Sequence, residues 1–179
     1  MKIRRIVTGL DGNGKAVLQS DTRLERTFDS LPGFANTLFW STDGVPEVGV
    51  GRGADPVPSV RSYMPGPGGT RLMLVALPPD ASMALPGFDP AAYGAEVASK
   101  VPGFGEAFEP DAPGMHTTDT VDYGVLLDGE VWLELDDGRE VQLQPRDVVV
   151  QNGTRHAWRN KSGRQATLLF VLVGARRRR

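Results

Sequence analysis

The sequence of 179 residues contains no cysteine, only two histidines and no long apolar run. Without cysteine, the chain has no disulfide, no zinc site built on thiolates and no cysteine nucleophile. No run approaches the eighteen apolar residues of a membrane-spanning helix, and the first residues lack the apolar stretch of a signal peptide. These absences exclude several protein classes, and we expect a soluble, cytoplasmic protein without a membrane partner.

An excess of charge is also missing, because the formal net charge is −2 at pH 7. A nearly neutral domain has no broad electrostatic footprint for nucleic acid, so we expect no nucleic-acid partner. The one basic cluster is the run of arginines at residues 176–179. It follows the last expected strand, and we expect residues 175–179 to form a solvated, disordered tail.

Turn-forming residues are abundant, with 22 glycines and 14 prolines in the chain. From residue 115 onward, short β-patterned runs alternate with turns such as Asp-Gly and Asn-Gly, which are strong hairpin signals between apolar runs. The expected strands are 115–127, 130–136, 139–144, 147–151, 155–160 and 166–173. Short strands joined by tight turns predict an all-β fold, either an antiparallel sandwich or a small barrel.

The first part of the chain is less regular. Strands are expected at 2–8, 15–19, 23–29 and 34–42, followed by a buried strand at 71–78. We expect residues 1–45 to be an N-terminal β extension that packs on the barrel or on a partner subunit in a homodimer. Residues 46–70 are rich in glycine and proline, and predict a loop that acts as a lid or wraps a partner. One short helix is expected after Asp89 as N-cap, with Pro90 at its first position.

Both histidines stand beside β-patterned runs. His116, Thr118 and Asp122 share the parity of one strand, so their side chains project from the same face. His156 and Trp158 share a face of a later strand. If these strands lie opposite each other in a barrel, two imidazoles and one carboxylate converge. Such a set with open positions suits non-haem Fe(II), and also zinc, manganese or nickel.

The residues around the two histidines resemble the two motifs of the cupin superfamily. The first motif is Gly114-Met-His116-x-Thr118-x3-Asp122-x6-Gly129, and the second is Asp147-Val-Val-Val-Gln-Asn-Gly153-Thr154-Arg-His156-x3-Asn160. The resemblance covers residues 71–174 and implies a cupin-type jelly-roll β-barrel with a divalent metal ion inside. It implies His116, Asp122 and His156 as the metal ligands. Thr118 stands where the family has a second histidine, and Asp122 replaces a longer glutamate.

A metal-dependent enzyme that acts on an oxygen-rich small metabolite is the leading interpretation. The ion would stabilise developing negative charge in a decarboxylation, dehydration or isomerisation, and Fe(II) would allow dioxygen chemistry. The catalytic residues expected at the reacting groups are His116, His156, Thr118 and Trp158. Three alternatives stay open: a metal-free catalytic pocket, a non-catalytic barrel that binds a small ligand, and a structural role for the histidines.

Other residues near the motifs have two interpretations each. Tyr123 and Trp158 either stack on a flat substrate or fill the core. Arg155 would suit a substrate carboxylate, but its alternation from His156 turns it outward. Asp119 is a fallback metal ligand, although its parity points it to the opposite face of the strand.

Overall fold

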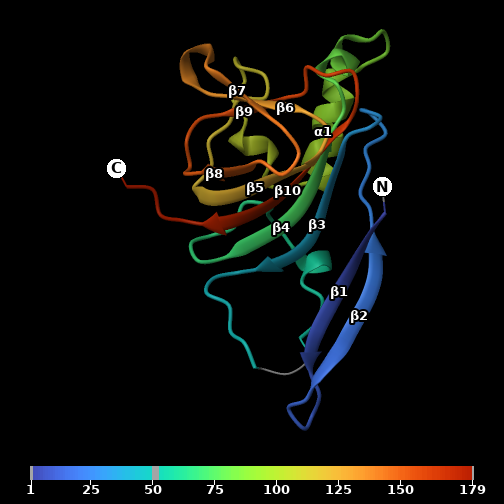
Figure 1. The fold of residues 1–179 in the computed structure, drawn as a ribbon, viewed down its shortest axis with the longest axis vertical. Coiled ribbons are helices and arrows are strands. Elements are labelled where there is room, and N and C mark those ends of the chain that lie inside the picture. The colour runs from blue at the N-terminus through green and yellow to red at the C-terminus, as the bar shows by residue number, and fades with distance from the viewer. Residues whose placement is uncertain (1, 50–52, 179) are drawn as a thin grey trace.

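The computed structural model describes residues 2–49 and 53–178, and it confirms an all-β fold with one short helix. Its strands are β1 (Ile3–Leu10), β2 (Ala16–Leu24), β3 (Ala35–Thr42), β4 (Thr70–Leu77), β5 (Thr120–Asp128), β6 (Val131–Glu134), β7 (Glu140–Leu143), β8 (Val148–Gln151), β9 (Ala157–Arg159) and β10 (Ala166–Gly174). The described helices are α1 (Pro90–Lys100) and the 3-10 turns η1 (Val57–Ser59), η2 (Asp80–Ala84), η3 (Gly105–Ala107) and η4 (Asp136–Gly138). Figure 1 shows the barrel in the upper part of the view, with β1 and β2 below it on the right.

Two antiparallel sheets make up the barrel. The larger sheet has the strand order β3-β4-β10-β5-β8, and the smaller has the order β7-β6-β9. Burial alternates along β10, because Leu168 and Leu172 are buried in the core whereas Leu169 and Val171 are only partly buried. Leu126 of β5 faces the same core. The arrangement confirms the predicted jelly-roll barrel, with one face of each strand turned inward.

The two sheets meet at His116. The strand predicted at 115–127 begins only at Thr120, because His116 instead forms an isolated bridge with His156, next to β9 of the smaller sheet. The ladder of β5 with β8 and β10 starts after this point. The chain therefore passes from one sheet to the other between residues 116 and 120.

The N-terminal extension is a hairpin of β1 and β2, which form a separate two-stranded sheet. Arg5 of β1 anchors it: the guanidinium donates to Phe39 O at 3.0 Å, pairs with Asp55 and lies 6.0 Å from the ring of Trp40. The separate strand predicted at 23–29 is wrong. β2 runs without interruption to Leu24, after which the chain makes only an isolated bridge to β3.

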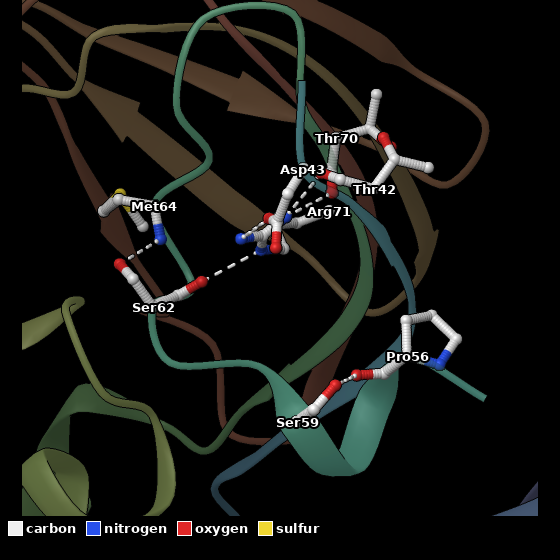
Figure 2. A network of polar contacts seen from close by, with 8 residues as sticks. All are labelled: Thr42, Asp43, Pro56, Ser59, Ser62, Met64, Thr70 and Arg71. Atoms are coloured by element: carbon white, nitrogen blue, oxygen red, sulfur yellow. Dashed lines mark hydrogen bonds and ion pairs between the residues drawn. The ribbon is translucent and has the colours of Figure 1, made fainter. Parts of the chain in front are cut away.

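The Gly/Pro-rich segment 46–70 is fastened to the barrel by Arg71, which is 3% exposed. Its guanidinium donates to Ser62 O at 2.9 Å and to Thr42 O at 2.8 Å, and pairs with Asp43 at 2.8 Å. Dashed lines mark these contacts in Figure 2. A buried guanidinium is stable only when its donors are paired, so this network ties the segment at Ser62 to β4 and to the residues that follow β3. Residues 50–52 lie outside the described residues, and the role of the segment as a lid stays a prediction.

Helix α1 begins where the sequence predicts. The Asp89 carboxylate accepts from the backbone N–H groups of Ala91 and Ala92 at 2.9 and 3.1 Å, and Pro90 occupies the first helical position. This pairing satisfies donors that a helix start leaves open. Across residues 2–49 and 53–178, every helix falls short of the length and apolar character needed to cross a membrane.

Candidate functional site

The two histidines lie side by side where the two sheets meet. Their backbones exchange two hydrogen bonds, from His116 N to His156 O at 2.9 Å and in the reverse direction at 3.0 Å. The imidazole centroids are 4.1 Å apart, and the ring planes are inclined by 51°. The residues are 6% and 2% exposed. The structure thus brings together both histidines that the sequence singles out.

Each imidazole is held in one tautomer by the backbone. His116 Nδ1 lies 3.0 Å from Gly114 O, and His156 Nδ1 lies 2.9 Å from Thr154 O. A carbonyl oxygen only accepts, so Nδ1 of each neutral ring carries the hydrogen and Nε2 keeps a lone pair. Neither Nε2 has a hydrogen-bond partner among the described residues, and neither is fully enclosed. Both Nε2 atoms are therefore free to bind a ligand or to take a proton.

Burial favours the neutral form of both rings. Desolvation lowers the pKa of His116, while its bond to Gly114 O and the charge of Glu109 oppose the shift. Desolvation and, less strongly, the neighbouring His116 lower the pKa of His156 to about 4, and its bond to Thr154 O opposes part of the shift. A buried ring in a low-dielectric setting resists the added charge. The pair therefore presents two neutral bases at neutral pH.

The histidine pair stands within a chain of aromatic rings. The ring of Phe108 lies 4.8 Å from His116, and the indole of Trp158 lies 5.8 Å from His156. Trp158 is half-buried and packs in turn on Phe170 at 5.3 Å. Trp158 therefore contacts both the core and the histidines, so the core and stacking interpretations both remain open for it.

A second buried polar group lines the inner face of β5. The Thr120 hydroxyl donates to the Thr118 hydroxyl at 2.8 Å, and Asp122 lies opposite Gln151 of β8. Asp122 and Gln151 are 7% and 4% exposed. Asp122 Oδ1 and Gln151 Nε2 are enclosed and have no hydrogen-bond partner among the described residues. Burial raises the pKa of Asp122 to about 6, and Thr120 opposes part of the shift.

The predicted metal set is only partly assembled. Within residues 2–49 and 53–178, no three histidine, aspartate or glutamate side chains gather closely enough to hold a metal ion. His116 and His156 offer two nitrogen ligands, whereas catalytic zinc and facial iron sites use three protein ligands. Asp122 instead lies opposite Gln151. The residues do not fit a three-ligand site in this arrangement, and that site stays a prediction.

The sequence also offers three further residues near the motifs, and all three face away from the histidines: Tyr123, Arg155 and Asp119. Tyr123 is 48% exposed on the outer face of β5, so its interpretation as a core residue is wrong, and its stacking on a substrate stays a prediction. Arg155 turns outward as expected and pairs with Glu109 at 2.7 Å. Asp119 also points to the other face, where it pairs with Arg177 at 2.5 Å. Arg177 belongs to the tail predicted to be disordered, yet this residue is held against the barrel.

Sequence reasoning missed Phe108 and Gln151. Phe108 reaches His116 through an isolated bridge between segments outside the described strands, so no spacing on a strand reveals it. Gln151 carries a readable signal, because it is the only polar residue of β8 and is buried. A polar residue at an inward position of an apolar strand indicates a functional or hydrogen-bonded site.

A cavity of about 450 Å³ lies apart from the histidines, between the end of β2 and the end of α1. It is lined by Glu25, Arg26, Thr27, Ser99 and Lys100. Its two cations are engaged within the protein, since Arg26 donates to the Tyr63 hydroxyl at 3.0 Å and Lys100 pairs with Glu96 at 2.5 Å. This cavity is therefore not part of the candidate site.

Comparison with known proteins gives local matches, and no protein-family model matches the chain. The chain is 56% identical over 63 residues to phomopsin biosynthesis cluster protein C' of Diaporthe leptostromiformis, covering 35% of this chain and 33% of that protein. It is 43% identical over 65 residues to oryzines biosynthesis cluster protein J of Aspergillus oryzae, covering 36% of each. A cupin-domain-containing oxidoreductase of Aspergillus ruber is 38% identical over 69 residues, covering 35% of this chain and 34% of that protein. The chain covers about a third of the length of these relatives.

Solved cupin structures are similar at a coarser level. An RmlC-like cupin with a double-stranded β-helix fold from Methanocaldococcus jannaschii has a TM-score of 0.38 at 11% identity, over 59% of this chain and 70% of that one. A cupin 2 conserved barrel domain protein from Salinispora arenicola has a TM-score of 0.38 at 13% identity, over 84% and 87%. Structural similarity at TM-scores this low carries no information about the site. The cupin-domain relative, together with the barrel, confirms the resemblance to the cupin superfamily.

Proposed function

We propose that this chain is a cupin enzyme that moves a proton on an oxygen-rich small molecule, with the histidine pair as its acid–base centre. One observation carries the proposal: two buried imidazoles lie together, and both Nε2 atoms lack a partner among the described residues. Local similarity to biosynthesis cluster proteins and to a cupin-domain-containing oxidoreductase supports a small-molecule substrate.

His116 is the better proton acceptor of the two. The Glu109 carboxylate favours its charged form, whereas His156 has a pKa of about 4. Two imidazolium rings with centroids 4.1 Å apart would repel each other, so the pair holds one added proton at a time. His156 then remains neutral, and its Nε2 accepts a hydrogen bond from a substrate hydroxyl.

The proposed reaction is an isomerisation. His116 Nε2 takes a proton from a carbon next to a substrate carbonyl, and the electron pair of the broken C–H bond moves toward the carbonyl oxygen. The protonated imidazole then returns the proton at another position of the substrate. The reaction needs no oxidant, because it moves a proton and shifts an electron pair within the substrate. A positioned base of this kind typically contributes about 10²–10⁴-fold to the rate.

Neighbouring side chains would orient the substrate. The Thr118 hydroxyl accepts from Thr120, so its own hydrogen is free to donate to a substrate oxygen. Phe108 and Trp158 stand on opposite sides of the histidine pair and would pack on a flat, apolar part of the substrate. These residues bind and orient, while His116 moves the proton.

A divalent iron, manganese, zinc or nickel ion is the cofactor that the cupin resemblance implies. Such an ion would act as a Lewis acid on a substrate oxygen. Because the third ligand does not join the two histidines in the described residues, no step of the proposed reaction passes through a metal. Elemental analysis decides the point. About one equivalent of metal in protein purified without nickel resin, lost in His116→Gln, would contradict the metal-free proposal.

The catalytic test uses exchange with D₂O. The protein is incubated in D₂O with a panel of carbonyl acids and phenolic ketones, and deuterium incorporation is followed by mass spectrometry. We expect incorporation into at least one substrate, reduced at least ~100-fold in His116→Gln. Leu85→Gln, which places the same new side chain at a position 62% exposed, serves as the matched control and keeps the full rate.

A non-catalytic barrel that binds a small ligand is the second candidate. The enclosed and unpartnered Asp122 Oδ1 and Gln151 Nε2 favour it, because together they suit a bound hydroxyl that donates to one atom and accepts from the other. Binding of a panel compound without deuterium incorporation would support this candidate and overturn the proton-transfer proposal. Equal incorporation in the parent and in His116→Gln would overturn the role of the histidine.

A further inference from the structure

Residues 104–113, here called the strap, run past the histidine pair between helix α1 and strand β5. All of these residues are described, and they form the 3-10 turn η3 followed by irregular loop. Every residue of the strap keeps part of its surface in contact with water, whereas Val101 and Met115, just outside its two ends, are 1% and 4% exposed. The strap is therefore anchored in the core at both ends and loosely packed between them.

Two aromatic rings of the strap face the histidines. Phe108 forms an isolated bridge with His116, which in turn bridges His156. Residues that pair in this way across antiparallel segments present their side chains on the same face. The ring of Phe108 accordingly lies 4.8 Å from the ring of His116. The ring of Phe104 lies 5.0 Å from Phe108 and 6.0 Å from His116, so the strap lies against one side of the histidine pair.

The histidine pair has little contact with water in this arrangement, since the two residues are 6% and 2% exposed. A small molecule that contacts both Nε2 atoms needs more room, because ligand pockets typically measure about 300–1,000 Å³. A segment beside the pair must therefore move before such a molecule binds. Strands β5 and β9 are held by ladders of hydrogen bonds, whereas the strap, described throughout, joins its neighbour by a single bridge at Phe108. The strap is therefore the segment that opens at low cost.

A glycine with a positive φ stands just outside each end of the strap. The φ angles of Gly103 and Gly114 are 78° and 81°. Glycine adopts this region and the ordinary one with similar ease, so it absorbs a change of backbone direction that another residue would resist. A Cβ at Gly114 would also lie 2.8 Å from Arg159 Nη1. Two such positions act as hinges for the segment between them.

An ion pair on the opposite face ties the strap to the barrel. Glu109 follows Phe108 and Arg155 precedes His156, so both charged side chains point away from the rings. Arg155 Nε and Nη2 donate to the two carboxylate oxygens of Glu109, each at 2.7 Å, and Nη1 donates to Asp136 at 2.9 Å. Two-point pairing of this kind is specific in its geometry. The paired side chains are 35% and 36% exposed, so water competes for the contact and it can open.

We infer that the strap is a lid on the histidine pair, held shut by Glu109 and Arg155. It turns outward about the two glycines to admit a small molecule to the Nε2 atoms. Glu109 and Arg155 are then positioning residues, because they act through the place of the aromatic rings. The sequence predicts a lid at residues 46–70, and the inference places one at residues 104–113. A lid serves proton transfer and non-catalytic binding alike, so the inference depends on neither.

Chemical modification of the histidines tests the inference on the full chain without a substrate. Diethyl pyrocarbonate acylates a neutral imidazole at a nitrogen lone pair, and mass spectrometry of peptides follows His116 and His156 separately. Burial keeps both rings neutral at pH 7, so the rate reports access to the rings. We expect Glu109→Gln and Arg155→Gln to be modified about 3- to 10-fold faster than the parent, on the scale of one exposed two-point ion pair.

Glu140→Gln is the matched control. It makes the same substitution in another exposed ion pair, that of Glu140 with Lys161 at 2.5 Å, which lies outside the strap. It is expected to keep the modification rate of the parent, and circular dichroism verifies that each variant is folded. A folded Glu109→Gln or Arg155→Gln with the rate of the parent overturns the inference. An equal acceleration in Glu140→Gln also overturns it, because the loss of any ion pair would then have the same effect.

A reversible cross-link separates a lid from a loop that is merely loose. Glu109 N–H donates to Met115 O at 2.9 Å, so these two residues lie opposite each other beside the bridge of Phe108 with His116. Opposite residues of antiparallel segments are within reach of a disulfide, and the chain contains no cysteine of its own. In Glu109→Cys/Met115→Cys, the cross-linked form is expected to be modified several-fold more slowly than the same protein after reduction. Equal rates in the two forms overturn the inference.

Discussion

On strand β5, the inward-facing Thr120 and Asp122 are 3% and 7% exposed, whereas the outward-facing Tyr123 and Leu127 are each 48% exposed. The usual antiparallel sheet has the opposite pattern, with apolar side chains inside and polar ones outside. The inversion is local, because Leu126, further along the inner face, is apolar and 1% exposed. The polar stretch is limited to the half of the strand that follows His116.

The two faces show how departures from the ordinary pattern indicate function. Asp122 buries a carboxyl group whose Oδ1 has no partner among the described residues, which costs free energy of folding, and such costs persist mainly where they serve a site. The outer face is apolar and exposed to water, where an antiparallel sheet normally carries polar side chains. One strand thus separates a candidate site on its inner face from an exposed apolar surface on its outer face.

The largest effect is expected from His156→Gln. Removing His156 takes away the Nε2 that accepts a hydrogen bond from the substrate hydroxyl, so turnover should fall by about 10–100-fold. The assay is deuterium incorporation with the substrate that the parent labels. Turnover within a few-fold of the parent would show that the reaction does not need the second histidine.

Asp122→Asn tests the cost of the buried carboxyl group. Burial raises its pKa from 3.8 to about 6, so the folded state binds the proton more tightly than the unfolded state. The carboxyl group therefore lowers the stability of the parent progressively as the pH rises from about 4 to above 6. The substitution should raise the free energy of unfolding by about 1–3 kcal/mol at pH 7 and change it little at pH 3.

Urea unfolding at several pH values measures this difference. Asp111→Asn, at an exposed position, is the matched control and should change the stability little at any pH. A parent and an Asp122→Asn variant with the same stability at pH 7 would contradict the cost assigned to the inner face.

Gly124→Ala tests how tightly the inner face is packed. A Cβ at Gly124 would lie 2.8 Å from Phe170 Cε1, the ring against which Trp158 packs. Overpacking of this kind should lower the free energy of unfolding by about 1–2 kcal/mol in thermal or urea unfolding. Gly163→Ala meets no atom within 4 Å and should be close to neutral. Equal stability of the two variants would show that the barrel accommodates the methyl group.

The smallest effect is expected from Arg177→Gln. Arg177 pairs with Asp119 and donates to Thr118 O at 2.8 Å and Gly153 O at 3.1 Å, so it links the segments before β5 and after β8. The side chains of the ion pair are 46% and 64% exposed, and such pairs contribute less than about 1 kcal/mol. A loss above about 2 kcal/mol in thermal unfolding would make this contact a structural anchor.

The sequence predicts the barrel and the meeting of His116 and His156, because strand parity and turn signals are local. It does not predict that the chain passes between sheets from residue 116 to residue 120, a step that depends on pairing with a distant segment. Asp122 lies opposite Gln151, and within residues 2–49 and 53–178 it does not join the two histidines in a group that could hold a metal ion. The outward orientation of Tyr123 is predictable from the sequence, because an inward Asp122 requires its neighbour on the strand to face outward.

Nitrogen NMR of the full chain with ¹⁵N-labelled histidine, titrated from pH 8 to pH 4, tests the central claim most directly. The account predicts that both neutral rings carry the hydrogen on Nδ1, with Nε2 unprotonated, and that His156 gains its proton only near pH 4. A hydrogen on Nε2 in the neutral rings, or protonation of His156 at an ordinary pKa of 6.5, would contradict it.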